Sequence, residues 1–571
     1  SELILTGGEM DSANATVLLN GNVTAHASDQ VARIAGKLSL NGGQRTFAVA
    51  SGTISPGLEI TAAISGTAAS GLIKTDTGEL RLSGANNYSG PTVVEAGTLG
   101  VFHSTALGAT GAGSPLHGTS VAVGATLLLN SVSVGSEYLY LRSDGYLGAG
   151  VLFNQQGNNS WAGDIELMAS TCINISGGSS LNLTGRITGA GDLTKWGSGT
   201  LKIAGDTSND FIGTTWIDAG TLQLAKHNSH RAIPGSLRIG ALDGPPVTVT
   251  VLSNYQFTPG MTSVTLQPGC TFNINQSTQF ISGLYGFGEV QLPGVLEMAN
   301  GNYGGNISGN GTLLVSSAGP GGLRLTGTNT FTGRAYVDFA NLYVDGVFPV
   351  PVHVLTSGGV GGTGIVGNVD ISLGRLSPGV GHFGTGVLRT GHLAVTNGSI
   401  FRFETRDIPN GIAYDRAEVT GSVRLDDANL QLVLGSAGRS NIAYILILND
   451  GNDPIQGTFN GLPEGATFMH DGGQFEITYQ GGTGNDVILR QETPTTNSFP
   501  VQLSIQPKDA NWVTLTWPSY ASAYQLQYCT NLAASAWWPA AGGYSNNDGT
   551  NVVWNQLTLN RPTCFFRLAY P

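Results

Sequence analysis

Cysteine, charge and long apolar runs are all scarce in this sequence. The 571 residues include 4 cysteines, and only 11% of the residues are charged. No apolar run approaches the roughly 18 residues that a membrane-spanning helix needs. Lysine and arginine (25) are outnumbered by aspartate and glutamate (37), which gives a net charge of −12. This balance disfavours nucleic acid and anionic lipid as partners, because neither would gain Coulomb attraction.

Apolar residues at helical spacing are also lacking over any useful length. Glycine, in contrast, accounts for 85 residues, about twice its average share. Many β-branched residues favour sheet, and the low charge argues against disorder. The alternative is a glycine-rich low-complexity polymer. It fits less well, because apolar and polar residues alternate regularly.

One stretch, from 78 to 99, recurs twice along the chain. It reads G-E-L-R-L-S-G-A-N-N-Y-S-G-P-T-V-V-E-A-G-T-L, and its counterparts span 199–222 and 322–342. Leu80 and Leu82 alternate with polar residues, which predicts a strand with one buried face. The stretches end 123 residues (from 99 to 222) and 120 residues (from 222 to 342) apart. A near-constant interval of this kind indicates a repeat architecture.

The residues that define the repeat are apolar, aromatic or glycine. They are Leu80, Tyr88, Gly90 and Leu99 in the first stretch, Leu201, Phe211, Gly213 and Leu222 in the second, and Leu323, Phe331, Gly333 and Leu342 in the third. A preamble, Ile64-Ser65-Gly66, recurs at Ile187 and Ile307, again at intervals of 123 and 120. The repeat is therefore longer than the stretch itself.

The pattern G-x-L-x-L-x-G-x-N-x-[YF]-x-G…A-G-T-L resembles the autotransporter-associated β-strand repeat of large secreted bacterial proteins. The resemblance implies that each stretch is one coil of a right-handed parallel β-solenoid (β-helix). It implies no catalytic residues, because the family is defined by its strands. We therefore expect an all-β protein built on a solenoid.

Domain boundaries follow from changes in this pattern. We expect a solenoid over 1–344 in three units of about 121 residues, at 1–101, 102–224 and 225–344. Terminal coils and a closing segment are expected over 345–490, and a polar, proline-flanked linker over 491–500. The T-W-P…Y-Q-L-Q…F-F-R-L pattern of 501–571 resembles a fibronectin type III-like (Ig-like) β-sandwich seen in secreted proteins of Verrucomicrobia and their relatives.

The four cysteines divide into two pairs. Cys172 and Cys270 lie in different repeats and are expected to be small buried residues too far apart for a bond. Cys529 and Cys564 each lie at the end of an expected strand of the C-terminal domain. A disulfide between them and a pair of buried thiols both remain open.

Two turns carry the oxygen-rich residues that calcium prefers. Gly481 to Leu489 matches the nonapeptide G-G-x-G-x-D-x-U-x and contains Asp486, while Asp450 and Asp453 lie in a second turn. Calcium needs six to eight oxygens, and the nonapeptide works in consecutive copies, so simple turns are favoured. His227 and His230 have an H-x-x-H spacing without a third zinc ligand, which favours an exposed loop. No cofactor is expected.

Catalytic patterns are sparse. The acids fall mostly alone, and neither a G-x-S-x-G elbow nor a phosphate loop occurs. We expect a non-catalytic extracellular structural protein, a rod at or shed from the bacterial cell surface that assembles head-to-tail with itself into a homopolymeric filament. One alternative is an adhesin that binds extracellular glycans, with Trp537, Trp538 and Trp554 as a stacking platform unless they fill a core. A second alternative is a polysaccharide lyase or hydrolase. The sequence begins directly in a strand-like segment, from which we expect an exported chain without its signal peptide.

Overall fold

The computed structural model describes 2–67, 69–109, 117–317, 321–379, 384–409, 411–435, 442–451, 453–492, 501–509, 512–518, 524–529, 538–539, 544–547, 551–557 and 565–569. Across these ranges the regular elements are β-strands, apart from a 3₁₀ turn at Tyr146–Gly148 and a 3₁₀ residue at His117. No helix found there is long and apolar enough to cross a membrane. The expected all-β class is confirmed.

Backbone contacts divide the chain into two units. The first comprises Ser1–Gly359 and Gly364–Gly367, and the second comprises Val360–Thr363 and Asn368–Pro571. The boundaries expected from the sequence at 344 and around the linker remain predictions.

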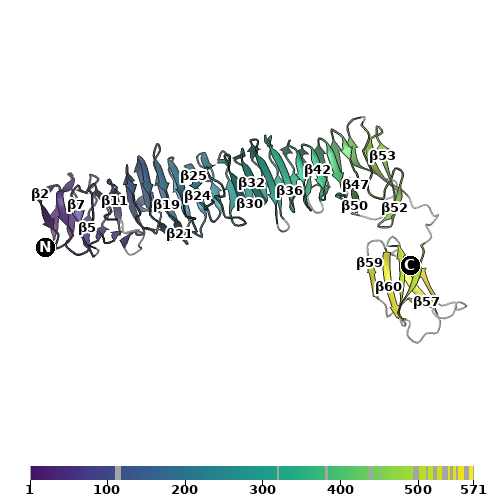
Figure 1. Cartoon of the computed structure of the whole chain (residues 1–571), viewed down its shortest axis with the longest axis horizontal. Coiled ribbons are helices and arrows are strands. Elements are labelled where there is room, and N and C mark those ends of the chain that lie inside the picture. Colours follow the sequence, from purple (N-terminus) through teal and green to yellow (C-terminus); the bar gives the residue numbers. More distant parts are fainter. Residues whose placement is uncertain are drawn as a thin grey trace. The chain divides into compact units, whose positions relative to one another are not determined.

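Strands of the first unit stack in parallel, each on the strand one coil before it (Figure 1). One nine-stranded sheet, sheet 1, contains β1 (Leu3–Leu5), β3 (Val23–Ala25), β5 (Arg45–Val49), β8 (Leu72–Thr75), β10 (Thr92–Val94), β12 (Thr119–Val121), β15 (Leu139–Leu141), β18 (Ile165–Leu167) and β21 (Ile187–Gly189). A second, sheet 2, contains β14 (Ser133–Val134), β17 (Asn158–Trp161), β20 (Ser180–Leu183), β23 (Thr200–Gly205), β25 (Gly220–Lys226), β27 (Val247–Val251), β29 (Thr271–Asn273), β31 (Glu289–Gln291) and β33 (Asn306–Ser308).

A third set of parallel strands, sheet 3, runs along the whole unit. It contains β2 (Gly8–Leu18), β4 (Ala32–Ser39), β6 (Leu58–Ile60), β7 (Ala63–Ser65), β9 (Glu79–Leu82), β11 (Gly97–Val101), β13 (Ala125–Asn130), β16 (Leu152–Gln156), β19 (Thr171–Ile175), β22 (Leu193–Trp196), β24 (Thr215–Ile217), β26 (Leu237–Ile239), β28 (Ser263–Leu266), β30 (Thr278–Gly286), β32 (Val295–Tyr303), β34 (Thr312–Ser316), β35 (Gly322–Leu325), β36 (Arg334–Asp338), β37 (Asn341–Val344) and β39 (Val352–Val354). Parallel pairing from coil to coil is the arrangement of a β-solenoid.

The repeat leucines form the interior of the coils. Each opening leucine lies in register with the closing leucine of the same stretch, one coil later: Leu80 with Leu99, Leu201 with Leu222, and Leu323 with Leu342. All six are fully buried. Each stretch is therefore one coil, and its side chains stack on those of the next coil.

The repeat glycines are needed for space. A Cβ at Gly90 would collide with the backbone oxygen of Ser70, and one at Gly213 with that of Gly191. A Cβ at Gly333 would collide with the backbone oxygen of Gly311 in the same way. Because the coil before passes directly over this position, no side chain fits there. The aromatic residues two positions earlier, Tyr88, Phe211 and Phe331, are buried at the same corner.

An asparagine in each stretch joins three coils. The buried side chains of Asn86, Asn209 and Asn329 accept a hydrogen bond from the preamble isoleucine of the coil before and donate one to a carbonyl of the coil after. The acceptor bonds come from the N–H groups of Ile64 (2.8 Å), Ile187 (2.9 Å) and Ile307 (2.9 Å), and the donor bonds go to the carbonyls of Ala106 (2.6 Å), Ala232 (2.8 Å) and Val347 (3.0 Å). This explains why preamble and stretch recur together.

A buried lysine closes the turn before the first two stretches. Lys195 Nζ donates to the carbonyls of Trp196 (3.3 Å), Gly197 (2.6 Å) and Ala219 (2.8 Å). Lys74, 121 residues earlier, makes the same bonds to Thr75, Asp76 and Ala96. Burial lowers the pKa of both ammonium groups to about 8. Val315 occupies the corresponding place in the third repeat.

The repeat advances by one face of the solenoid from the first copy to the second. In the first copy β8 and β10 belong to sheet 1, and β9 and β11 to sheet 3. In the second copy, the counterparts β22 and β24 lie in sheet 3, and β23 and β25 in sheet 2. The interval between copies is therefore not a whole number of coils. Equivalent outward side chains point to different sides of the molecule.

The second unit begins with parallel coils and ends in antiparallel strands. The parallel pairs are β42 (Val369–Ser372) with β45 (Leu393–Thr396), β46 (Ile400–Ile408) with β50 (Asn429–Val433), and β44 (Val387–Thr390) with β48 (Arg416–Val419). β51 (Ile442–Asn449) extends from β48, and β54 (Asp486–Glu492), β53 (Gly473–Gly481) and β52 (Thr467–His470) follow in antiparallel order. Antiparallel strands end a parallel ladder because they pair with the backbone groups at the edge of its last strand.

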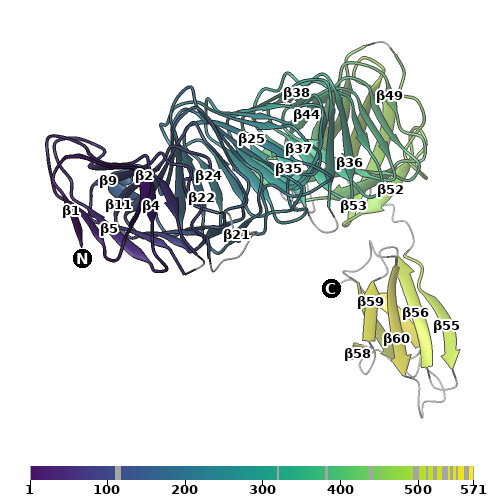
Figure 2. The same ribbon diagram turned by 60° about the vertical axis from the view of Figure 1, so that its left-hand side comes forward.

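The C-terminal strands form two antiparallel sheets with one core. One sheet is β55 (Ser504–Asp509), β56 (Trp512–Pro518), β60 (Asn551–Leu557) and β59 (Tyr544–Asn547), as Figure 2 shows, and the other is β58 (Trp538–Pro539), β57 (Gln525–Cys529) and β61 (Phe565–Ala569). Leu515, Trp517 and Leu526 are buried between them, and Trp554 packs against this core. The likeness to a fibronectin type III domain stays a prediction.

Glu137, just before β15, is a buried acid in the first unit. Its side chain accepts a hydrogen bond from Thr119 Oγ1 at 2.8 Å, and its exposed fraction is 2%. Burial raises the pKa of this carboxyl to about 7, and the Thr119 bond opposes part of that rise.

Replacing Lys195 by methionine tests the turn-closing role. Three carbonyls lose their donor, while removal of a buried charge offsets part of the loss, so we expect a destabilisation of about 3 kcal/mol. Chemical denaturation followed by circular dichroism measures it. Lys202→Met on β23, whose side chain is partly exposed, is the matched control. Equal stability of the two variants would contradict the role.

Replacing Glu137 by glutamine tests the buried acid. Its folded pKa of about 7 lies above its ordinary value of 4.5. The group therefore stabilises the fold fully below pH 4.5, and that contribution, roughly 3 kcal/mol, is lost as the pH rises through 7. Glu137→Gln is expected to flatten the dependence of the urea midpoint on pH between those values. Glu95→Gln, at an exposed position, should leave it as in the parent chain.

Candidate functional site

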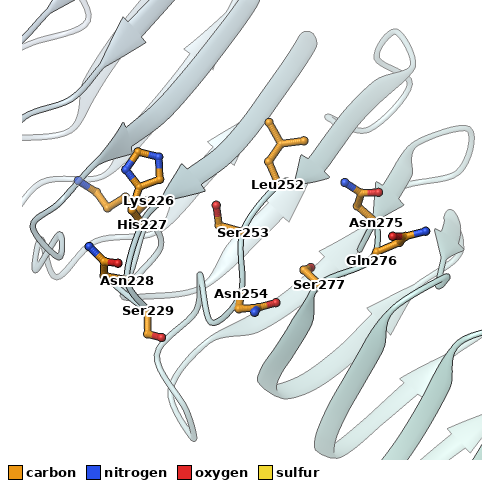
Figure 3. A pocket seen from close by; sticks show the side chains of 10 residues that line it. All are labelled: Lys226, His227, Asn228, Ser229, Leu252, Ser253, Asn254, Asn275, Gln276 and Ser277. Atoms are coloured by element: carbon orange, nitrogen blue, oxygen red, sulfur yellow. The ribbon is translucent and has the colours of Figure 1, made fainter.

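A polar groove of about 600 Å³ opens on the first unit (Figure 3). Its lining comes from the turns that follow β25, β27 and β29, three strands stacked on successive coils. Seven of the ten lining residues carry amide or hydroxyl side chains: Asn228, Ser229, Ser253, Asn254, Asn275, Gln276 and Ser277. The groove is therefore a surface of hydrogen-bonding groups.

Buried glutamines hold the turns beneath the groove. The side chain of Gln256 accepts a bond from the N–H of Lys226 (2.9 Å) and donates to the carbonyls of Lys226 (3.0 Å) and Asn254 (2.9 Å). Gln279 accepts from the N–H of Gln256 (2.8 Å) and donates to the carbonyl of Ser253 (2.8 Å) and to Ser277 Oγ (3.0 Å). Both glutamines are fully buried. A satisfied buried network of this kind fixes the turns in one arrangement.

The backbone of the groove is in an uncommon conformation. Asn228 (φ 51°), Ser229 (φ 64°) and Asn275 (φ 52°) line it with positive φ, and Tyr255 (φ 56°) follows the lining residue Asn254. Positive φ is uncommon for residues other than glycine, and such residues cluster where a site is pre-formed. The ring of Tyr255 stacks on Phe280 at 5.4 Å, which holds this residue in place.

The two basic residues of the groove are already engaged. Lys226 Nζ donates to the carbonyls of Ala204 (2.9 Å) and Gly185 (3.2 Å). Burial lowers the pKa of its ammonium to about 8, and the carboxylates of Asp164 and Asp206 oppose this. His227 Nδ1 lies 3.0 Å from Asp206 Oδ1. The lining as a whole offers neutral donors and acceptors.

No motif in the sequence indicates this groove. Of its lining residues, only His227 belongs to a recognisable pattern, the H-x-x-H pair. In the structure His230 Nδ1 lies 3.2 Å from Ser208 Oγ, so the two histidines have different partners. The signal that would have located the groove is the run of amide and hydroxyl residues at 228–229, 253–254 and 275–277, spaced by about one coil.

The calcium candidates lie at the end of the antiparallel strands in the second unit. Asp486 Oδ1 accepts the N–H of Asn449 at 3.0 Å. The carbonyl of Asp453 accepts from Asn449 Nδ2 at 3.1 Å. Asn485 Nδ2 donates to the carbonyls of Gly451 and Asp453, so the turn after Asp450 packs on the glycine-rich turn. Among the described residues, no group of three or more His, Cys, Asp or Glu could hold a metal ion. Calcium binding at these aspartates stays a prediction.

Three cysteines fall within the described chain. Cys172 and Cys270 are buried and unbonded, one in each of two repeats. Cys529 is buried at the end of β57, opposite Phe565, and is bonded to no described residue. Cys564 lies outside the described residues, so the predicted pair stays untested. Trp537 of the predicted stacking platform also lies outside them, whereas Trp554 packs on the domain core.

A buried acid in the second unit, Asp415, accepts hydrogen bonds from the backbone. Asp415 accepts the N–H groups of Gly386 (3.0 Å) and Glu404 (3.1 Å). Burial is the main cause that raises the pKa of this carboxyl, to about 8. Asp415 directly precedes β48, and its side chain joins the backbone just before β44 to β46.

Comparison with known families identifies the repeated stretches. The family model of the passenger-associated-transport-repeat matches residues 72–101, 193–224 and 318–337. These segments overlap the three copies found in the sequence, and the third match ends before Leu342. The first two include the buried Lys74 and Lys195 as well as the paired leucines.

Two known proteins are similar to parts of the chain. The adhesin BmaC autotransporter of Brucella suis biovar 1 (strain 1330) is 32% identical over 178 residues, which is 31% of this chain and 4% of that protein's length. The Hap adhesin of Haemophilus influenzae aligns in structure over 84% of this chain and 64% of its own, with 10% identity and a TM-score of 0.27, too low to define a shared fold. The chain therefore contains three passenger-associated-transport repeats, and their paired leucines lie in successive solenoid coils.

Proposed function

We propose that the chain is a non-catalytic extracellular solenoid that carries an adhesive surface. One observation supports this above others: the recurring residues are used inside the fold. Leucines stack, asparagines bridge coils and lysines close turns. What recurs is thus a scaffold, and outward side chains are free to differ from coil to coil. The partial match to a Brucella adhesin agrees with this role.

The groove fits adhesion better than catalysis. Glycoside hydrolysis uses two carboxyl groups flanking the bond that breaks. The groove lining consists mainly of amides and hydroxyls, which bind without transferring protons at neutral pH.

Exposure of the full chain to cells and to polysaccharides tests the proposal. We expect purified chain to adhere to a cell or matrix surface in a saturable way. We also expect no release of reducing ends or unsaturated sugars from a polysaccharide panel. Catalytic release would contradict the non-catalytic role, and an absence of saturable adhesion would contradict the adhesive one.

Head-to-tail self-association of the chain is a further proposal, carried over from the sequence. The edges of parallel strands present unpaired N–H and C=O groups. A heterologous contact between such edges does not form a closed ring, and it therefore leads to a filament. We expect concentrated protein to show filaments by negative-stain microscopy. Single particles at every concentration, with a constant sedimentation coefficient, would contradict assembly.

A further inference from the structure

We propose that the groove formed by the turns after β25, β27 and β29 binds an uncharged saccharide chain. This inference rests on the proposed adhesive function and names its ligand class. It places the binding site on one face of the first unit, at residues that all lie outside the repeated stretches.

The lining chemistry matches sugar hydroxyls. An Asn or Gln amide carries a carbonyl acceptor beside an NH₂ donor, and a serine hydroxyl can donate and accept. Ser277 Oγ is already bonded to the carbonyl of Ile274 and to Gln279, and Asn254 Oδ1 accepts the N–H of Thr278. Asn228 and Gln276, on the first and third turns, are exposed, and their side chains make no hydrogen bond to the described chain. Vicinal sugar hydroxyls need this mixture of donors and acceptors. Leu252, exposed by 42%, adds an apolar contact for a ring face.

The charges favour a neutral ligand over an acidic one. The ammonium of Lys226 donates to two backbone carbonyls, and His227 lies against Asp206. An anionic polysaccharide would need a cation that is not already paired. The formal charge of −12 on the chain adds a general repulsion.

The shape suits a linear chain. The three turns come from successive coils, and hydrogen-bonded strands lie about 4.8 Å apart. A saccharide that crosses the coils meets one turn after another (Figure 3). The volume of about 600 Å³ is in the range of small-ligand sites. The turns are fixed by Gln256 and Gln279, so binding costs little ordering of the protein.

A matched pair of double variants of the full chain tests the site. Asn228→Gly with Gln276→Ala removes two groove side chains, and glycine accepts the positive φ of residue 228. Asn397→Gly with Gln480→Ala makes the same changes at exposed positions of the second unit, where Asn397 also has a positive φ. The probes are hexasaccharides of β-1,4-glucose, β-1,4-mannose and α-1,4-galacturonate, measured by calorimetry.

We expect at least one neutral hexasaccharide to bind, with little change between low and high salt. The groove variant should bind it roughly tenfold more weakly, because two hydrogen bonds are lost, and the control variant as the parent does. The groove variant should also adhere to cells more weakly than the parent chain, and the control variant should adhere as the parent does. Circular dichroism confirms that all three proteins are folded.

Other outcomes overturn the inference in distinguishable ways. Equal binding by the groove variant, or binding of the galacturonate alone with loss in salt, refutes the groove as a neutral-sugar site. If no hexasaccharide binds while the chain still adheres to cells, the site assignment is wrong and the adhesive function stands. If the parent chain neither adheres nor binds a sugar, both proposals are wrong.

Discussion

The parallel backbone ladder between successive coils is the constraint on which the structure depends. Each coil must place its strands in register with the coil before, because its N–H and C=O groups have no other partners. Register in turn fixes which side chains face inward, as the stacked leucines at 80 and 99 illustrate. Lys195 and Asn209 are polar residues inside the coils, and both bond to backbone groups of neighbouring coils.

Interior polar residues therefore act as coil-to-coil connectors. Asn209 bonds to the coil before and to the coil after. Gln256 and Gln279 make the same kind of bonds between coils beneath the groove. An apolar side chain at these places would leave backbone groups unpaired. The same kind of residue thus serves the scaffold inside the molecule and provides recognition groups outside it.

The advance of the repeat by one face has a consequence for function. Equivalent outward residues of the first and second copies do not form one continuous stripe, since β8 and its counterpart β22 belong to different sheets. A surface site therefore does not arise by repetition. It arises where neighbouring turns differ from the repeat, as at 226–229, 252–254 and 275–277.

The sequence by itself determined the fold class, the coil and its buried face. Alternation at Leu80 and Leu82 and the interval between copies were sufficient, because both depend on local spacing. It also located Gly90 and its counterparts, though not the reason for them. The roles of Lys74 and Asn86, the advance of the repeat around the solenoid and the gathering of Asn228, Asn254 and Gln276 were decided by tertiary structure. These features depend on residues about one coil apart in sequence, and only the folding of neighbouring turns onto one another shows which of those residues meet.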